Sequence, residues 1–270
     1  MKYKMLVLDM DDTLLTDDHR ISDINKEALR KAQEMGIYVV LASGRPTPAM
    51  TSFAAELNLA HFDSYILAYN GAVIMRIKDE SILFEQSLTK DEIHRLYDFS
   101  VAHKVHIITY INGKIVSETD SLYIDIEKKI TGMPFEKVSN FKAAVTGSAI
   151  KCILLEEPNY LKEVEAILKK EMLDKSVATS KPYFLEVTHH GIDKAESLKR
   201  LAEKLNIKQE EIIAVGNAGN DLSMVEYAGL GVWVDNVTPE LRDKADVIVA
   251  SNNNDGVAEV VERFILNHSK

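Results

Sequence analysis

The strongest constraint on the fold is the alternation of short apolar runs with segments of helical periodicity at both ends of the chain. Near the start, KMLVLDM has the length and apolar content of a buried strand, and IYVVLAS follows as a second such run. Between them, Ser22 has the features of a helix N-cap and Gly36 those of a helix stop. Strands that alternate with helices in this way favour a parallel sheet covered by helices.

The last third of the chain repeats this pattern. One face of a predicted helix carries Leu198, Leu201, Ala202 and Leu205, and EIIAVG, a short helix and GLGVWV follow. We therefore predict an α/β protein in which both ends of the chain build one Rossmann-like parallel sheet, with helices on both faces.

The pattern changes between about residues 82 and 188. Thr89 and Glu92 have the spacing of a helix capping box, and Asn112-Gly113 in INGKI is typical of a two-residue hairpin turn. The predicted strands KVHIITY, KIVSE and YFLEVT alternate with long connections. We predict an inserted α+β domain at 83–188, with its own sheet, inside a core domain formed by 1–82 and 189–270.

Charge and composition bear on location and partners. The chain has 270 residues and a formal net charge of −10, so it has little attraction for nucleic acids or anionic membrane surfaces. The first apolar stretch is shorter than a signal peptide or a membrane span requires. We expect a cytoplasmic protein with no nucleic-acid or membrane partner. The single cysteine, Cys152, lies in the apolar run CILL and is expected to be a buried hydrophobic residue.

Ligands of an open parallel sheet bind at the carboxyl ends of its strands, so the residues that follow each apolar run are the candidates for chemistry. Four segments qualify: DMDDT at 9–13, SGR at 43–45, Lys194 before its helix, and GNAGND at 216–221. Carboxylates gathered at one edge repel one another unless a cation neutralises them, and their oxygen atoms suit Mg²⁺. Hydroxyl groups and an ammonium group beside them are the donors that a phosphoryl group needs. The pattern predicts phosphoryl transfer.

Four motifs in this order resemble those of the haloacid dehalogenase-type phosphatases: DMDDTLL, LASGR, the lysine of GIDKAESL, and GNAGND. The first two motifs lie 34 residues apart, which leaves room for one helix only. The long insertion lies between the second motif and the lysine, and AYNGAVI precedes it. This arrangement resembles the Cof-type subfamily, whose α/β cap domain closes over small sugar phosphates and related metabolites.

The resemblance implies a role for each matching residue. Asp9 would attack phosphorus to form an aspartyl-phosphate, and Asp11 would protonate the leaving oxygen and then activate water. The implied phosphate-binding residues are Thr13, Ser43, Gly44, Lys194 and Asn220. Arg45 and Asn70 are candidates for substrate contacts. The implied cofactor is Mg²⁺, and its implied ligands are Asp9, Asp11, Asn217 and Asp221.

Two departures from the family pattern stand out. Asn217 occupies the position at which the family usually has a metal-binding aspartate, so we expect the affinity for Mg²⁺ to be reduced. Asp235 replaces a frequent glycine in WVDNV, so that loop is expected to differ in shape. Three functions remain open: a Mg²⁺-dependent phosphatase acting on small phosphorylated metabolites such as sugar phosphates, a catalytically impaired protein that binds such a metabolite, and a phosphomutase.

Overall fold

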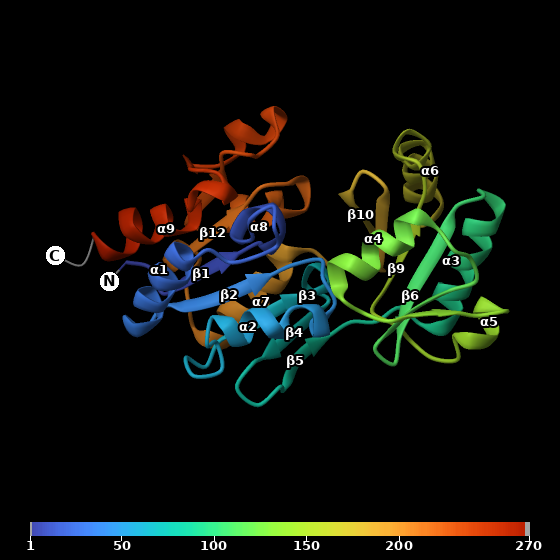
Figure 1. The fold of residues 1–270 in the computed structure, drawn as a ribbon, viewed down its shortest axis with the longest axis horizontal. Coiled ribbons are helices and arrows are strands. Elements are labelled where there is room, and N and C mark those ends of the chain that lie inside the picture. The colour runs from blue at the N-terminus through green and yellow to red at the C-terminus, as the bar shows by residue number, and fades with distance from the viewer. Residues whose placement is uncertain (1, 268–270) are drawn as a thin grey trace. The chain divides into compact units, whose positions relative to one another are not determined.

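The structure is a computed structural model that describes residues 2–267, and it divides into two compact units (Figure 1). The larger unit consists of the described residues of Met1–Phe84 and Asp193–Lys270, and the smaller unit is Glu85–Ile192. Each unit has a sheet of its own. The predicted α/β core with an inserted second sheet domain is thereby confirmed.

The larger unit contains an eight-stranded sheet with the order β14-β13-β12-β1-β2-β3-β4-β5. Its strands are β1 (Met5–Leu8), β2 (Tyr38–Ala42), β3 (Tyr65–Ala68), β4 (Val73–Arg76), β5 (Ile82–Glu85), β12 (Ile212–Gly216), β13 (Leu230–Val234) and β14 (Val247–Val249). The strands from β14 to β3 are parallel, as the alternating pattern predicted. β4 is antiparallel to β3, because only a short turn joins them and a parallel pair needs a crossover of a dozen or more residues. This antiparallel edge was not predicted.

Helices cover both faces of this sheet. They are α1 (Asp23–Glu34), α2 (Thr51–Glu56), α7 (Lys194–Leu205), α8 (Leu222–Tyr227) and α9 (Gly256–Val261). On one face, Val7 of β1 belongs to a hydrophobic cluster with Leu198 of α7 and Met224 of α8. Side chains alternate along a strand, so the fully buried Leu8 points to the opposite face. On that face, α1 packs against β2 and α9 (Figure 1).

The boundaries of α1 follow from its sequence. Ser22 is the N-cap, and its side chain accepts a hydrogen bond from the backbone N–H of Asn25 at 3.0 Å. The helix ends at Glu34, and Gly36 then adopts a positive φ of 85° that favours glycine. The predicted helix between these two residues is confirmed, and it carries the chain from the end of β1 back to the start of β2.

The smaller unit has a six-stranded sheet with the order β10-β11-β9-β6-β7-β8. Its strands are β6 (His106–Ile111), β7 (Lys114–Ser117), β8 (Phe135–Lys137), β9 (Lys151–Leu155), β10 (Lys175–Lys181) and β11 (Phe184–His189), and its helices are α3 (Lys90–Ala102), α4 (Leu122–Thr131), α5 (Phe141–Ala144) and α6 (Pro158–Glu171). Residues of α3 and α6 pack on one face of this sheet, for example Leu96 and Leu168 against Cys152. Burial raises the pKa of the Cys152 thiol to about 12, so this residue behaves as the expected buried hydrophobic residue.

Local signals in the smaller unit are also confirmed. Thr89 and Glu92 form a capping box at the start of α3. Asn112 and Gly113 both have positive φ, 50° and 73°, which is the conformation of the hairpin turn predicted between β6 and β7.

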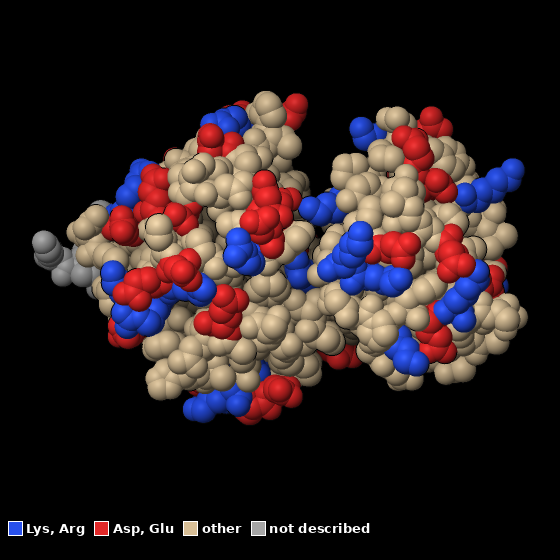
Figure 2. Space-filling model, viewed as in Figure 1, with Lys and Arg blue, Asp and Glu red and all other residues tan. Residues whose placement is uncertain are grey.

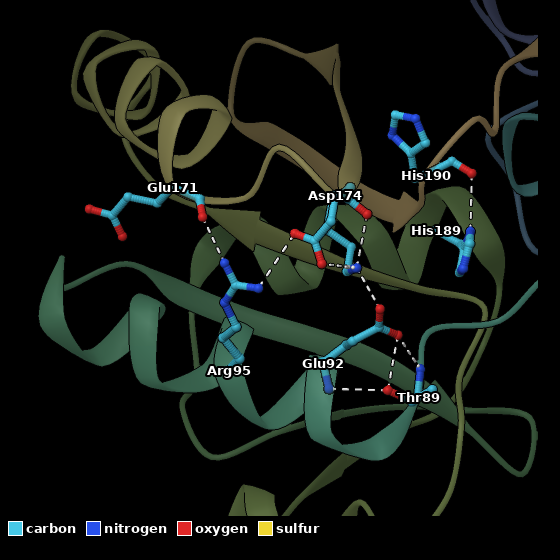
Figure 3. A network of polar contacts seen from close by, with 8 residues as sticks. Thr89, Glu92, Arg95, Glu171, Asp174, His189 and His190 are labelled. Carbon is cyan, nitrogen blue, oxygen red and sulfur yellow. Dashed lines mark hydrogen bonds and ion pairs between the residues drawn. The ribbon is translucent and has the colours of Figure 1, made fainter.

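A network of polar contacts ties α3 to the segment between α6 and β10 (Figure 3). The guanidinium of Arg95 donates to the carbonyl oxygen of Glu171 at 2.6 Å. The nearly buried Lys175 ammonium lies 2.5 Å from the Glu92 carboxylate and 2.7 Å from that of Asp174. These ion pairs neutralise Lys175 where β10 begins.

Acidic and basic side chains are interspersed over both units on the face shown in Figure 2, and no continuous basic stripe crosses that face. Among residues 2–267, no helix combines the length and the apolar character that crossing a membrane requires.

Candidate active site

The register of the larger sheet brings the predicted motifs to one edge. Strand β1 lies between β2 and β12 (Figure 1). Leu8, the last residue of β1, pairs with Leu41 of β2 on one side and with Val215 of β12 on the other. The next residue, Asp9, therefore lies between the ends of these two strands, and its backbone N–H donates to the carbonyl of Val215 at 2.9 Å. The first, second and fourth motifs meet because their strands are neighbours.

Lys194 joins these strand ends. It is the first residue of α7, and its ammonium group is completely buried. Its Nζ donates to Asp9 Oδ1 at 2.6 Å, to Asp221 Oδ1 at 2.6 Å and to the carbonyl of Ala42 at 2.9 Å. Burial alone would lower the pKa of Lys194, but the charges of Asp221 and Asp9 outweigh it and raise that pKa above its ordinary value. Lys194 therefore remains charged.

Asp9 is a carboxylate with a strongly perturbed pKa. Its pKa is raised from 3.8 to about 7, first by burial and then by the negative charge of Asp221, against the opposing effect of Lys194. The ammonium group of Lys194 therefore offsets only part of the effect that burial and Asp221 have on the pKa of Asp9. Within residues 2–267, only Oδ1 of Asp9 is engaged in a hydrogen bond, so Oδ2 is available to a ligand.

Asp221 shapes the loop that follows β12. Its Oδ2 accepts the backbone N–H groups of Asn217 and Ala218 at 3.0 and 3.1 Å, while Oδ1 accepts from Lys194. Gly216 is required here, because a Cβ at that position would lie 2.5 Å from the Cβ of Asp221. Both carboxylate oxygens of Asp221 thus bind protein groups, and its place among the metal ligands stays a prediction.

Asn217 faces the turn after β1. Its Oδ1 accepts a hydrogen bond from the hydroxyl of Thr13 at 3.1 Å, and Thr13 is fully buried. The predicted phosphate-binding hydroxyl and the predicted metal-binding amide are therefore direct neighbours. Hydrogen bonds link residues of the first, third and fourth motifs into one group, in which the backbone N–H of Asn217 makes the connection to Asp221; its members are Asp9, Thr13, Lys194, Asn217 and Asp221.

Asp11 has a different partner. Its carboxylate accepts two hydrogen bonds from Arg45, from Nε at 2.9 Å and from Nη2 at 2.7 Å. Arg45 is only 6% exposed, and its guanidinium lies over the ring of Phe53. His19 approaches the same carboxylate, with 3.8 Å between its Nδ1 and Asp11 Oδ1. The predicted substrate contact of Arg45 stays a prediction. His19 was not predicted, because nothing in its local sequence marks it.

The second motif and the loop after β3 lie together. The carbonyl oxygen of Ser43 accepts a hydrogen bond from the backbone N–H of Asn70 at 2.9 Å. Gly44 lies between Ser43 and Arg45 in the sequence. Tyr69 and Asn70 both have positive φ, 53° and 56°, a conformation that is rare for tyrosine and more common for asparagine. Asn220 Nδ2 lies 3.5 Å from Asn70 Oδ1, so the loop after β3 reaches the fourth motif.

The donors at this edge fit a hard cation. Among residues 2–267, no three His, Cys, Asp or Glu side chains converge as a metal-binding group. Asp11 faces Arg45, and Asp221 is bound to Lys194 and the loop. The remaining donors are oxygen atoms of mixed type, the Asp9 carboxylate and the Asn217 amide, and Mg²⁺ binds through one or two carboxylates completed by substrate phosphate and water. Burial and the charge of Asp221 raise the pKa of Asp9, so a cation beside this carboxylate would favour its charged form.

Comparisons with known proteins agree with this geometry. The family described as haloacid dehalogenase-like hydrolase matches residues 6–261. The protein YxeH of Bacillus subtilis (strain 168) is 32% identical over 98% of this chain and 99% of its own length. The 5-amino-6-(5-phospho-D-ribitylamino)uracil phosphatase YcsE of the same organism is 30% identical over 97% of this chain and 96% of its own length.

A solved structure is similar over the whole fold. The crystal structure of a haloacid dehalogenase-like hydrolase from Bacteroides thetaiotaomicron aligns with a TM-score of 0.90 and 37% identity, over 98% of this chain and 100% of that one. The chain therefore belongs to the haloacid dehalogenase-like hydrolases and is a Cof-type phosphatase of that family.

Proposed function

We propose that this protein is a Mg²⁺-dependent phosphatase that hydrolyses small phosphorylated metabolites, such as sugar phosphates, through an aspartyl-phosphate on Asp9. The observation that carries the proposal is the buried contact of 2.6 Å between Lys194 Nζ and Asp9 Oδ1 at the carboxyl end of β1. This contact holds one oxygen of Asp9 and leaves Oδ2 to attack phosphorus.

The first step forms a bond between Asp9 Oδ2 and phosphorus while the bond from phosphorus to the leaving oxygen breaks. Lys194 lies beside the attacking carboxylate, so its charge stabilises the negative charge on the phosphoryl oxygens in the transition state. The Thr13 and Ser43 hydroxyls are the proposed donors to the same oxygens. Bound Mg²⁺ would supply further positive charge at this edge, and its proposed ligands are the Asp9 carboxylate, the backbone carbonyl of Asp11, Asn217 and Asp221.

The second step needs a group that moves protons. Asp11 is proposed to protonate the leaving oxygen in the first step. In the second step it takes a proton from the water that attacks phosphorus, while the bond between Asp9 Oδ2 and phosphorus breaks and inorganic phosphate leaves. Its carboxylate is held by two hydrogen bonds from Arg45, which define where it lies. We infer that Arg45 acts on the reaction through Asp11, by positioning that carboxylate.

The substrate class rests on the relatives. The relative YcsE carries the name of a phosphatase for a phosphorylated ribityl compound, and it matches this chain over almost its full length. We propose that the substrates of this chain are likewise small phosphate monoesters of polyhydroxylated carbon chains.

Release of inorganic phosphate tests the proposal. The panel contains sugar phosphates, 5-amino-6-(5-phospho-D-ribitylamino)uracil and p-nitrophenyl phosphate, each with Mg²⁺ and with a chelator. We expect turnover that depends on Mg²⁺ and disappears in Asp9→Asn. A chain that hydrolyses nothing, yet melts at a higher temperature with a phosphorylated ligand, would be the impaired binding protein. Isomerised product with a requirement for a bisphosphate would identify a phosphomutase.

A further inference from the structure

The turn that carries Asp11 and Thr13 has an unusual backbone. Residues Met10–Leu14 form a single wide turn that the N–H of Leu15 closes onto the carbonyl of Met10 at 2.9 Å. Within it, Asp12 adopts φ 59° and ψ 15°, the left-handed conformation, which is uncommon for residues with a Cβ although aspartate adopts it more readily than most. Such a conformation persists only where the surroundings hold it, and strained residues of this kind cluster at functional sites.

Asn236 holds this turn from a distant part of the chain. It follows β13, and its Nδ2 donates to the carbonyl oxygen of Asp12 at 2.7 Å. Its Oδ1 accepts the backbone N–H of Asn252 at 3.1 Å. A carbonyl can only accept and a backbone N–H can only donate, so these two partners determine which way the amide of Asn236 points. An asparagine satisfies both partners at once.

Asn252 holds the other end of the turn. It follows β14, is 2% exposed, and its Nδ2 donates to the carbonyl of Leu15 and to Asp17 Oδ1, both at 3.1 Å. The neighbouring Asn253 accepts the backbone N–H of Asp17 at 3.1 Å. The loops after β13 and β14 therefore contact the segment after β1 at Asp12, at Leu15 and at Asp17.

Asp235, which replaces a glycine that is frequent in the family, helps to hold the loop that carries Asn236. Arg242 donates to the Asp235 carbonyl at 2.9 Å and to its carboxylate at 2.8 Å. The loop that carries Asn236 is thus fastened by a side chain that a glycine at 235 would lack. A peptide unit is planar and trans, so a bond to the carbonyl of Asp12 also sets the direction of the N–H of Thr13.

We infer that Asn236 and Asn252 are positioning residues of the phosphoryl-transfer site. Together they clamp residues 12–15 in the conformation that presents Asp11 and Thr13, although neither asparagine belongs to the four motifs. That the two asparagines hold residues 12–15 follows from the hydrogen bonds alone. That they affect turnover rests on the proposed function.

Hydrogen exchange of the backbone amides tests the clamp without any turnover. The variant is Asn236→Ala, because Asn236 is exposed and we expect its truncation to leave the fold intact. The matched control is Asn254→Ala, whose side chain, among the residues that the structure describes, bonds only to the hydroxyl of Ser251. In the metal-free full chain, exchange at Leu15 should become about fivefold faster or more in Asn236→Ala, the change that loss of one ordinary hydrogen bond produces. The control should match the wild-type chain.

The kinetic comparison uses a substrate that the wild-type chain hydrolyses. Asn236→Ala should lower kcat by about 10- to 100-fold, as small misplacements of reacting groups do, with little change in KM. Asn252→Ala should act in the same direction. Unchanged exchange at Leu15 in Asn236→Ala would overturn the clamp, as would faster exchange with a wild-type kcat. An inactive wild-type chain would contradict the proposed function, and the exchange comparison would then decide the clamp by itself.

Discussion

Arg45 holds Asp11 through two hydrogen bonds of 2.9 and 2.7 Å, in a position where the guanidinium is almost completely buried. The two residues lie 34 positions apart and follow neighbouring strands, β1 and β2. A forked donor fixes the plane of a carboxylate as well as its place, which a single charge does not.

Arg45→Lys should therefore lower kcat by about tenfold, because a lysine keeps the charge but loses the fork, and a well-placed general acid contributes about 10²–10⁴-fold. The comparison is steady-state phosphate release beside Arg20→Lys, a change at an exposed arginine that bonds to Asp18. A kcat that rises in Arg45→Lys would mean that the pair restrains Asp11 away from the reaction.

Lys194 should be as important for stability as for activity. Lys194→Met leaves the buried carboxylates of Asp9 and Asp221 without their shared cation, so the free energy of unfolding at pH 8 should fall by about 3–5 kcal/mol. Urea titrations measure this, and Lys199→Met, an exposed position on the same helix, is the control. Adding Asp9→Asn to Lys194→Met should recover part of the loss. If the change in the free energy of unfolding of the double variant equals the sum of the changes in the two single variants, the charges are not coupled.

The raised pKa of Asp9 makes a prediction about pH. Its folded pKa of about 7 lies above the unfolded value near 3.8, so folding favours the protonated form. The contribution of protonated Asp9 to the free energy of unfolding is therefore fully present below pH 4 and is lost as the pH rises through 7. In chelator, Asp9→Asn should raise Tm at pH 8 by about 2–4 °C or more, and the difference should shrink towards pH 5.

Two controls accompany this melting series. Asp18→Asn, at an exposed position, should show no such trend. Added Mg²⁺ should stabilise the wild-type chain at pH 8 more than it stabilises Asp9→Asn. A difference in Tm that stays constant from pH 5 to pH 8 would contradict the assignment of the raised pKa to Asp9.

Asn217 should set the metal affinity. Its amide oxygen already faces Thr13, and a carboxylate oxygen at the same place can accept the same hydrogen bond. Asn217→Asp adds a negative charge to the donor set, so the Mg²⁺ concentration for half-maximal activity should fall by about tenfold or more. Asn254→Asp adds the same charge outside the site and should leave this concentration unchanged. Equal Mg²⁺ requirements in wild type and Asn217→Asp would show that residue 217 is not a ligand.

Much of the fold could be predicted because local and global signals agree. The capping box of Thr89 and Glu92 and the Asn112-Gly113 turn are local chemistry, and the apolar runs place β1, β2 and β12. The meeting of Asp9, Lys194 and Asp221 follows from parallel strands that end at the same edge.

The rest depends on contacts that no short pattern shows. The fork between Arg45 and Asp11 depends on the rotamers of both side chains, and the bond from Asn236 to Asp12 spans 224 positions of the sequence. The antiparallel β4 depends on a turn in which Tyr69 and Asn70 have positive φ, a conformation that residue preferences argue against for Tyr69. Such features are set by tertiary packing.

The central claim is that Asp9 carries the phosphoryl group, and trapping that group tests it most directly. Asp11→Asn is mixed with Mg²⁺ and acetyl phosphate, whose leaving group needs no general acid, then quenched in acid and digested for mass spectrometry. We predict a phosphoryl group on the peptide that contains Asp9, at higher occupancy than in the wild-type chain, because water is no longer activated. Steady release of phosphate by the wild-type chain, with no phosphorylated Asp9 peptide in either protein, would contradict the account.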